Sequence, residues 1–174
     1  MDHYEVQARL AILEQQFKTA ESIYLDNNQL DAAMEMYQDL HKWDEAVQLA
    51  EIKGHPDVES LRRAHTQWLL DTHQEERAGQ LKEAEGDFSA AINMYLKAGM
   101  PAKASRLATS VTELREDPEM ISRIATALLK ADLFEQAGEL HEKVGQQQKA
   151  LESYRKGHAY SRAVELARHM FPSG

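Results

Sequence analysis

The chain of 174 residues contains no cysteine. This excludes a disulfide framework and a thiolate metal site, and it is compatible with a reducing compartment. No apolar run approaches the roughly 20 residues that a membrane-spanning helix needs. The first residues, MDHYEVQARL, lack the basic and then apolar pattern of a signal peptide. The 8 glycines and 4 prolines are few, and they stand mostly between periodic segments.

Positive charge is scarce in the first half of the chain. Residues 1–90 carry 8 Lys/Arg and 19 Asp/Glu, a balance of −11, whereas residues 91–174 carry 12 and 10, a balance of +2. Binding to nucleic acid needs a basic stripe that neutralises phosphates, so the acidic first half argues against that class of partner. The excess of carboxylates is most simply a solvated surface that keeps the protein soluble.

Signatures of catalysis are also missing. The sequence has no nucleophile elbow, no Gly-rich phosphate loop and no HExxH motif. Its 8 histidines are dispersed: His65 and His73 are about two helical turns apart, too far to share one ion without a third ligand. His55, His158 and His169 fall near expected helix ends, where the helix dipole favours them. We therefore expect no enzyme, no metal, no cofactor and no small-molecule substrate.

The sequence does contain one stretch, residues 78–108, that occurs three times, with further copies near 20–50 and 137–167. In every copy the spacing is Ala, twelve residues, Ala, three, Tyr, eight, Ala, two, Leu-Ala. Self-similarity at a long fixed period indicates a stacked repeat architecture. With two glycines at an equivalent small position, the expected structural repeat positions are Ala20, Ala33, Tyr37, Ala46, Leu49, Ala50, Ala78, Gly79, Ala91, Tyr95, Ala104, Leu107, Ala108, Ala137, Gly138, Ala150, Tyr154, Ala163, Leu166 and Ala167.

Apolar residues recur at helical spacing along almost the whole chain, and no alternating strand of useful length is found. The periodicity predicts about eleven helices, one or two of them within residues 4–27. His55-Pro56 is expected to open one helix, because proline suits a first turn. Asp87 and Asp132 are expected to cap others, and Gly54, Gly86, Gly99, Gly145 and Gly157 to end them.

Helices of about 12 residues joined by short turns must lie antiparallel. Four helices in each 58- or 59-residue period predict an all-α, right-handed solenoid of tetratricopeptide-like hairpins. Ala91-Tyr95-Ala98 and Ala150-Tyr154-Gly157 fit the second half of the tetratricopeptide pattern, but its first-helix tryptophan is missing. The hairpins between the copies are degenerate. We expect residues 1–174 to form a single solenoid segment of a longer protein.

Three runs suggest a family. Residues 24–51, 66–107 and 149–168 contain HKWDEA, QEERAG, KAGMPAKA and ALESYRKG, which are more specific than generic helical-repeat composition. In these runs the chain resembles the large WD-repeat and tetratricopeptide-like subunit of the peripheral part of intraflagellar transport complex B. The likeness covers nearly the whole chain. It implies a slice of the early α-solenoid that follows two β-propellers in that family.

The resemblance implies a non-enzymatic scaffold in transport trains. Its partners would be other subunits of complex B, and its location the cytoplasm and the cilium, including the axoneme and basal body. Membrane contact is not indicated, and the resemblance supplies no binding residue.

Two alternatives remain: a membrane-coat-like trafficking solenoid and a peptide-binding tetratricopeptide module. The peptide clamp needs Lys, Arg and Asn on inner helices, whereas residues 13–27, 74–85 and 133–144 are mostly acidic or neutral.

Overall fold

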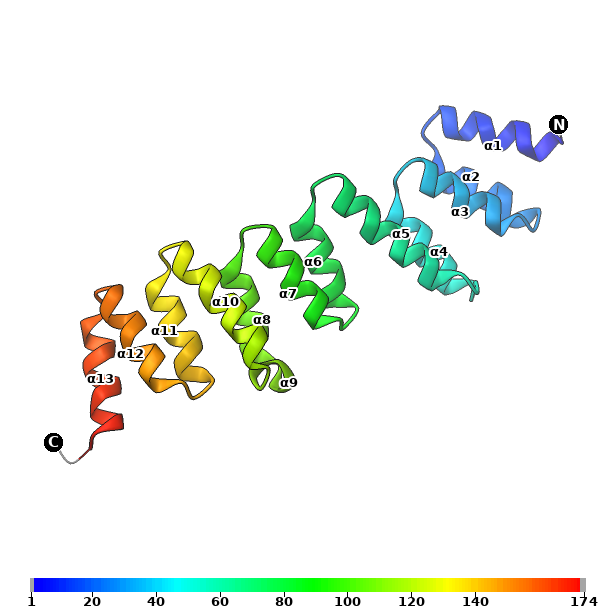
Figure 1. Ribbon diagram of the computed structural model, residues 1–174. Helices are drawn as coiled ribbons and strands as arrows, with labels where there is room; N and C mark the ends of the chain where they lie inside the picture. The colour runs from blue at the N-terminus through cyan, green and yellow to red at the C-terminus, as the bar shows by residue number, and fades with distance from the viewer. Residues whose placement is uncertain (1, 173–174) are drawn as a thin grey trace. The chain divides into compact units, whose positions relative to one another are not determined.

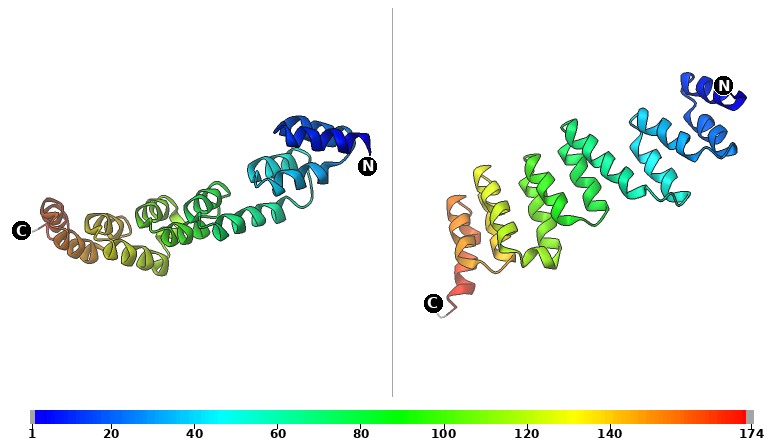
Figure 2. Two further views of the ribbon diagram at one scale, coloured as in Figure 1. Left: turned by 90° about the horizontal axis from the view of Figure 1, so that it is seen from above. Right: turned by 45° about the vertical axis from the view of Figure 1, so that its right-hand side comes forward.

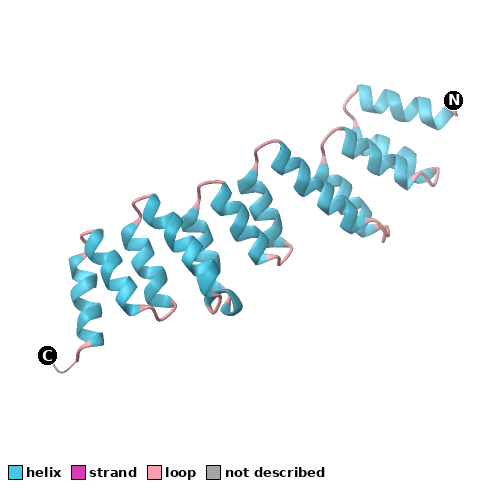
Figure 3. Cartoon of the chain, in the orientation of Figure 1, coloured by secondary structure: helices cyan, strands magenta, loops and turns pink. Residues whose placement is uncertain are grey.

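A computed structural model describes residues 2–172 as an all-helical chain. Across these residues there are thirteen α-helices and no strand, and Figure 3 shows helices joined only by short loops. The chain divides into two compact units, Met1–Trp68 and Leu69–Gly174, and the division falls within one helix. The all-α class with tetratricopeptide-like hairpins is confirmed.

The first unit contains four complete helices and most of a fifth. Successive helices α1 to α4 pack against one another, around a core of small residues and methionines. The helices, coloured blue to cyan in Figure 1, are α1 (His3–Leu13), α2 (Phe17–Asp26), α3 (Leu30–Asp39), α4 (Trp43–Ile52) and α5 (Val58–Asp71), the last of which continues into the second unit.

The second unit contains eight further helices. Each packs on its successor, and α8 packs on both α10 and α11, so the hairpins α6–α7, α8–α10 and α11–α12 follow one another (Figures 1 and 2). The helices are α6 (Glu75–Ala84), α7 (Phe88–Lys97), α8 (Pro101–Ser110), α9 (Thr112–Arg115), α10 (Pro118–Lys130), α11 (Phe134–Lys143), α12 (Gln147–Lys156) and α13 (Tyr160–Met170).

The turns explain the regular spacing. Most helices have 10 residues, and three-residue turns place a left-handed residue at every thirteenth position within each repeat. At the end of α6, Gly86 N–H donates to the Glu83 carbonyl at 3.1 Å and Asp87 N–H to the Lys82 carbonyl at 2.9 Å. This pair of bonds satisfies the last carbonyls of the helix. The ten positions are Gln15, Asn28, His41, Gly54, His73, Gly86, Gly99, Asp132, Gly145 and His158.

The thirteen helices exceed the expected eleven at two places. Residues 4–27 form two helices, because Gln15 adopts φ 60° and turns the chain; glutamine is not a residue that signals such a turn. Residues 112–130 are divided into α9 and α10, since Pro118 restricts the residue before it to an extended conformation and starts a new helix.

Three expected helix ends also differ. His55-Pro56 does not open α5, which begins at Val58, because the His55 ring accepts from Asp57 N–H at 3.0 Å and holds a turn. Asp132 does not cap α11; it occupies the left-handed position at φ 59°, and Leu133 is the N-cap residue. Gly157 is the C-cap of α12 at φ −86°, and His158 takes the left-handed position.

Candidate functional site

The residues of the repeated pattern lie in the core of the two units. Of the twenty expected repeat positions, all are buried except Ala167, which is half-buried. The alanines other than Ala167 are at most 6% exposed, and all of these except Ala78 belong to the hydrophobic clusters between helices. Such small side chains allow the helices to approach closely. The pattern thus brings together packing residues, not reactive groups.

Two glycines lie directly beneath two tyrosine rings. A Cβ atom added to Gly79 on α6 would stand 2.7 Å from Cε1 of Tyr95 on α7. The same atom on Gly138 would stand 2.5 Å from Cδ1 of Tyr154 on α12. Both rings are about 1% exposed. Glycine therefore provides the space that the ring occupies in each of these two copies.

Each of these tyrosines is tied to a carboxylate of the preceding helix. Tyr95 donates its hydroxyl proton to Glu83 at 2.5 Å, and Tyr154 donates to Glu142 at the same distance. Burial, followed by the Glu83 hydrogen bond and charge, raises the pKa of Tyr95 to about 12. Burial and then Glu142 raise the pKa of Tyr154 as well. Both hydroxyls are thus held protonated near neutral pH.

A cationic side chain lies near each tyrosine ring and also forms an ion pair that joins two helices not adjacent in sequence. Lys103 of α8 pairs with Glu76 of α6 at 2.5 Å, and its Nζ lies 5.8 Å from the centre of the Tyr95 ring.

In the next copy, 59 residues further on, Arg162 of α13 pairs with Glu135 of α11 at 3.2 Å and also with Glu139. Its guanidinium lies 5.8 Å from the centre of the Tyr154 ring. Sequence reasoning missed these pairs, although Glu76 and Glu135 occupy equivalent positions, and so do Lys103 and Arg162.

The first copy lacks this arrangement. Leu25 stands where the later copies have the accepting glutamate, and Glu21 stands where they have glycine. The Tyr37 hydroxyl is buried and has no hydrogen-bond partner within residues 2–172. Burial and then the nearby charge of Glu21 raise the pKa of Tyr37 to about 12. The Glu21 carboxylate therefore lies close enough to act on the hydroxyl, although it forms no bond as short as those of Tyr95 and Tyr154.

Both tryptophans of the chain lie in one aromatic stack of the first unit. The ring of Trp43 is parallel to that of His65, with centroids 5.7 Å apart. Trp68 stacks on His41 at 4.9 Å, and the two tryptophan rings are 6.1 Å apart. Both are half-buried. They act as wedges between helices, and not as exposed anchors.

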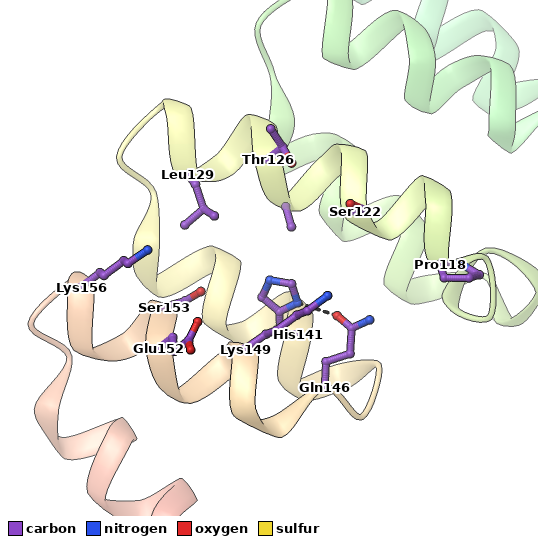
Figure 4. A pocket seen from close by; sticks show the side chains of 11 residues that line it. Pro118, Ser122, Thr126, Leu129, His141, Gln146, Lys149, Glu152, Ser153 and Lys156 are labelled. Atoms are coloured by element: carbon purple, nitrogen blue, oxygen red, sulfur yellow. Dashed lines mark hydrogen bonds between the residues drawn. The ribbon is translucent and has the colours of Figure 1, made fainter.

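A polar groove lies on the second unit, between α10 and α12, with α11 at its floor (Figure 4). It has a volume of about 300 Å³ and is bordered by Leu129, Thr126, Lys149 and Lys156. His141 lies in it, only 6% exposed, and its Nδ1 is 2.6 Å from Oε1 of Gln146. Burial is the first cause that lowers the pKa of His141 below 6.5.

The described residues contain no arrangement that would hold a metal ion. Within residues 2–172, no group of three or more His, Asp or Glu side chains converges in this way. No helix in the same range is long and apolar enough to cross a membrane. The ion pairs, the ring contacts and the groove between α10 and α12 are suited to holding helices in register and to binding.

Comparison with known proteins gives relatives along the whole chain. Residues 2–98 match the family model described as the IFT80/172/WDR35/WDR19 TPR domain. The chain is 56% identical over 171 residues to the intraflagellar transport protein 172 homolog of Homo sapiens, covering 98% of the chain. It is 42% identical over 172 residues to intraflagellar transport protein 172 of Chlamydomonas reinhardtii. It is 40% identical over 169 residues to intraflagellar transport protein osm-1 of Caenorhabditis elegans. The chain spans 10% of the length of each relative.

Proposed function

Because the chain belongs to the IFT80/172/WDR35/WDR19 TPR domain family, with intraflagellar transport 172 proteins among its relatives, we propose that it is a non-enzymatic scaffold segment of an intraflagellar transport train. The observation that carries this proposal is the identity of 40–56% across nearly all of the 174 residues. That identity continues past residue 98, where the family match ends, so it covers the second unit too.

The two linked tyrosine clusters support a scaffold role. A scaffold must keep binding surfaces at fixed separations, and bonds between successive helices resist sliding of one helix past another. Lys103 and Arg162 join helices across the intervening one, while Tyr95 and Tyr154 fill the space between them. We propose that residues 1–174 form one solenoid segment and that these cross-links hold the helices of its second unit in register.

The proposed partners are other subunits of intraflagellar transport complex B, and the proposed location is the cytoplasm and cilium, including axoneme and basal body. The names of the relatives support the transport role over a membrane-coat solenoid, because they are all intraflagellar transport proteins. A peptide clamp that binds a carboxylate needs basic side chains on its inner helices. Residues 133–144 are mostly acidic or neutral, so they do not support that alternative.

The test is binding of the purified 174-residue chain to purified complex B subunits, one at a time, by calorimetry. Charge reversal of one exposed patch per hairpin, for example Arg77→Glu on α6, should weaken one interaction and leave helicity by circular dichroism unchanged. Retention of a transport subunit with micromolar affinity or better supports the proposal. If the folded chain binds none of them, the partner assignment is contradicted, and the segment acts only as a spacer between other binding regions.

A further inference from the structure

The polar groove between α10 and α12 is a departure from the repeat. Ser153, 4% exposed, occupies the position that holds Met36 in the first copy and Met94 in the second. Two of three copies thus fill this position with a long apolar side chain, as a helical core favours. A serine is much smaller, and its place in the wall opens the hollow of about 300 Å³.

The same copy places two lysines on the rim of that hollow. Lys149 stands where the earlier copies have Ala32 and Ala90, so the fold does not need a cation there. Lys156 lies seven residues further along α12. Neither lysine makes a salt bridge to another of residues 2–172, in contrast to Lys103 and Arg162. Figure 4 shows the Lys149 side chain beside His141 and Gln146, and the Lys156 side chain toward one end of the groove.

The floor of the groove offers hydrogen bonds. Figure 4 shows the His141 ring within the groove, joined to Gln146. The amide oxygen of Gln146 lies 2.6 Å from Nδ1, which favours the tautomer with the proton on Nδ1 and leaves Nε2 as an acceptor. Burial lowers the pKa of this histidine, so the neutral ring prevails near pH 7. A ligand in the groove can donate an N–H to the ring.

We propose that this groove binds an acidic, extended peptide segment of a partner protein. Seven residues of helix separate the two lysines by about 10 Å along the axis. Three residues of an extended polyproline II segment span about the same distance, and they bring side chains three positions apart onto one face. Carboxylates three positions apart on the segment pair with Lys149 and Lys156. The residues between them must be neutral or basic, because Glu152 lines the groove between the two lysines.

The lysines and the serine of this site, Lys149, Lys156 and Ser153, take no part in the ion pairs that link α6 with α8 and α11 with α13. The proposal goes beyond the scaffold role and does not depend on it. Its test uses a synthetic peptide, so failure of the transport assignment and failure of the groove assignment are separate results.

The experiment is fluorescence anisotropy with the 174-residue chain and a fluorescein-labelled peptide containing Glu-Ala-Ala-Glu. The matched peptides carry Lys-Ala-Ala-Lys, or two adjacent glutamates. We expect the spaced acidic peptide to bind best. The double substitution Lys149→Ala with Lys156→Ala should weaken binding about three- to tenfold, since each exposed ion pair contributes modestly. Lys97→Ala, at the position equivalent to Lys156 one copy earlier, should have no effect.

The decisive variant is Ser153→Met, which restores the residue of the other copies. It should fill the hollow and abolish binding, with a thermal midpoint equal to or above that of the parent chain. The proposal is overturned if Ser153→Met and the double lysine variant bind the peptide as the parent does. It is also overturned if the acidic and basic peptides bind alike, or if neither binds at millimolar concentration.

Discussion

The Tyr154 ring lies so close to the backbone of Gly138 that a Cβ atom on the glycine would stand 2.5 Å from it. The ring cannot readily retreat, because it is 1% exposed and its hydroxyl is bound to Glu142. The contact joins a glycine on one helix to a tyrosine on the next, 16 positions later, and the same pair recurs at Gly79 and Tyr95.

Gly138→Ala is expected to destabilise the chain by up to about 2 kcal/mol. Alanine improves helix propensity by roughly 1 kcal/mol, but overpacking of a fixed aromatic ring typically costs about 1–3 kcal/mol. The free energy of unfolding from urea titration is the measurement. Gln80→Ala, exposed on α6 beside the other glycine, is the control that should change stability little. A gain in stability for Gly138→Ala would mean that the ring moves freely.

Removal of the three equivalent hydroxyls should give two different results. Tyr95→Phe and Tyr154→Phe each lose a hydrogen bond to a carboxylate, and we expect each to destabilise the chain by about 1–2 kcal/mol. Tyr37→Phe should be neutral or slightly stabilising, because its buried hydroxyl has no partner. The series is read by urea titration and amide hydrogen exchange of each copy. Equal effects at all three positions would show that the hydroxyl of Tyr37 has a hydrogen-bond partner in solution.

Alkaline pH is expected to unfold the repeats. The folded pKa of Tyr95 and of Tyr37 is about 12, against 10.0 for an exposed tyrosine. The folded state therefore holds protons that the unfolded state releases. This contribution to stability is complete below about pH 10 and is lost as the pH rises through 12. Helicity and tyrosinate absorbance should change together in that window. Ionisation of all tyrosines near pH 10 with helicity intact would contradict this.

Much of this fold could be predicted from the spacing of alanine and tyrosine, because equivalent helices in each copy need the same residue types at the same positions. Ala91 and Tyr95 recur at a fixed distance since a close helix crossing needs a small residue with an aromatic beside it. The turn at Gln15 could not be predicted, because glutamine rarely adopts a positive φ. It is held by the same pair of backbone bonds as the other turns, from Gln15 N–H to the Ile12 carbonyl and from Gln16 N–H to the Ala11 carbonyl. Asp132 was expected at an N-cap for its side chain, yet the thirteen-residue spacing of the turns decides its conformation.

The groove could not be predicted for a different reason. Its polar lining comes from three helices, and the signal is a single serine where the other copies have methionine. That difference becomes meaningful only once Met36 is known to be buried. The ion pairs of Lys103 and Arg162 were within reach, since their partners recur at the same 59-residue shift. Geometry was still needed to show that the side chains meet.

The left-handed turn positions provide a paired test. Gly86 has φ 83°, and His73, one turn position earlier, has φ 58°. An L-residue loses roughly 1–2 kcal/mol in this conformation, so Gly86→Ala should destabilise by about 1 kcal/mol. His73→Gly should stabilise by up to about 0.5 kcal/mol, because relief of strain is partly offset by the greater chain entropy of glycine. Thermal and urea unfolding measure both. The idea fails if both substitutions shift stability in the same direction.

The two charges of the ion pair between α6 and α8 should be interchangeable, so that either helix can carry the cation. The second copy has Glu76 and Lys103, whereas the equivalent positions of the first copy are Lys18 and Glu45, with the charges reversed. Lys103→Glu alone brings two carboxylates together beside Tyr95 and should destabilise by about 1 kcal/mol, more at low salt. The double substitution Glu76→Lys with Lys103→Glu should return to within about 0.5 kcal/mol of the parent chain, as a double-mutant cycle measures.

The control for this cycle is Lys97→Glu, which changes the same charge on α7 at a position with no ion pair to any of residues 2–172, and it should change stability little. If the double substitution stays as unstable as Lys103→Glu, then the position requires a cation, and the contact of Lys103 with the Tyr95 ring at 5.8 Å outweighs the pair with Glu76. That result would also predict a weaker inter-helix contact in the first copy, where the equivalent residue is an acid. Recovery would instead show that the solenoid needs complementary charge across these helices and is indifferent to its direction.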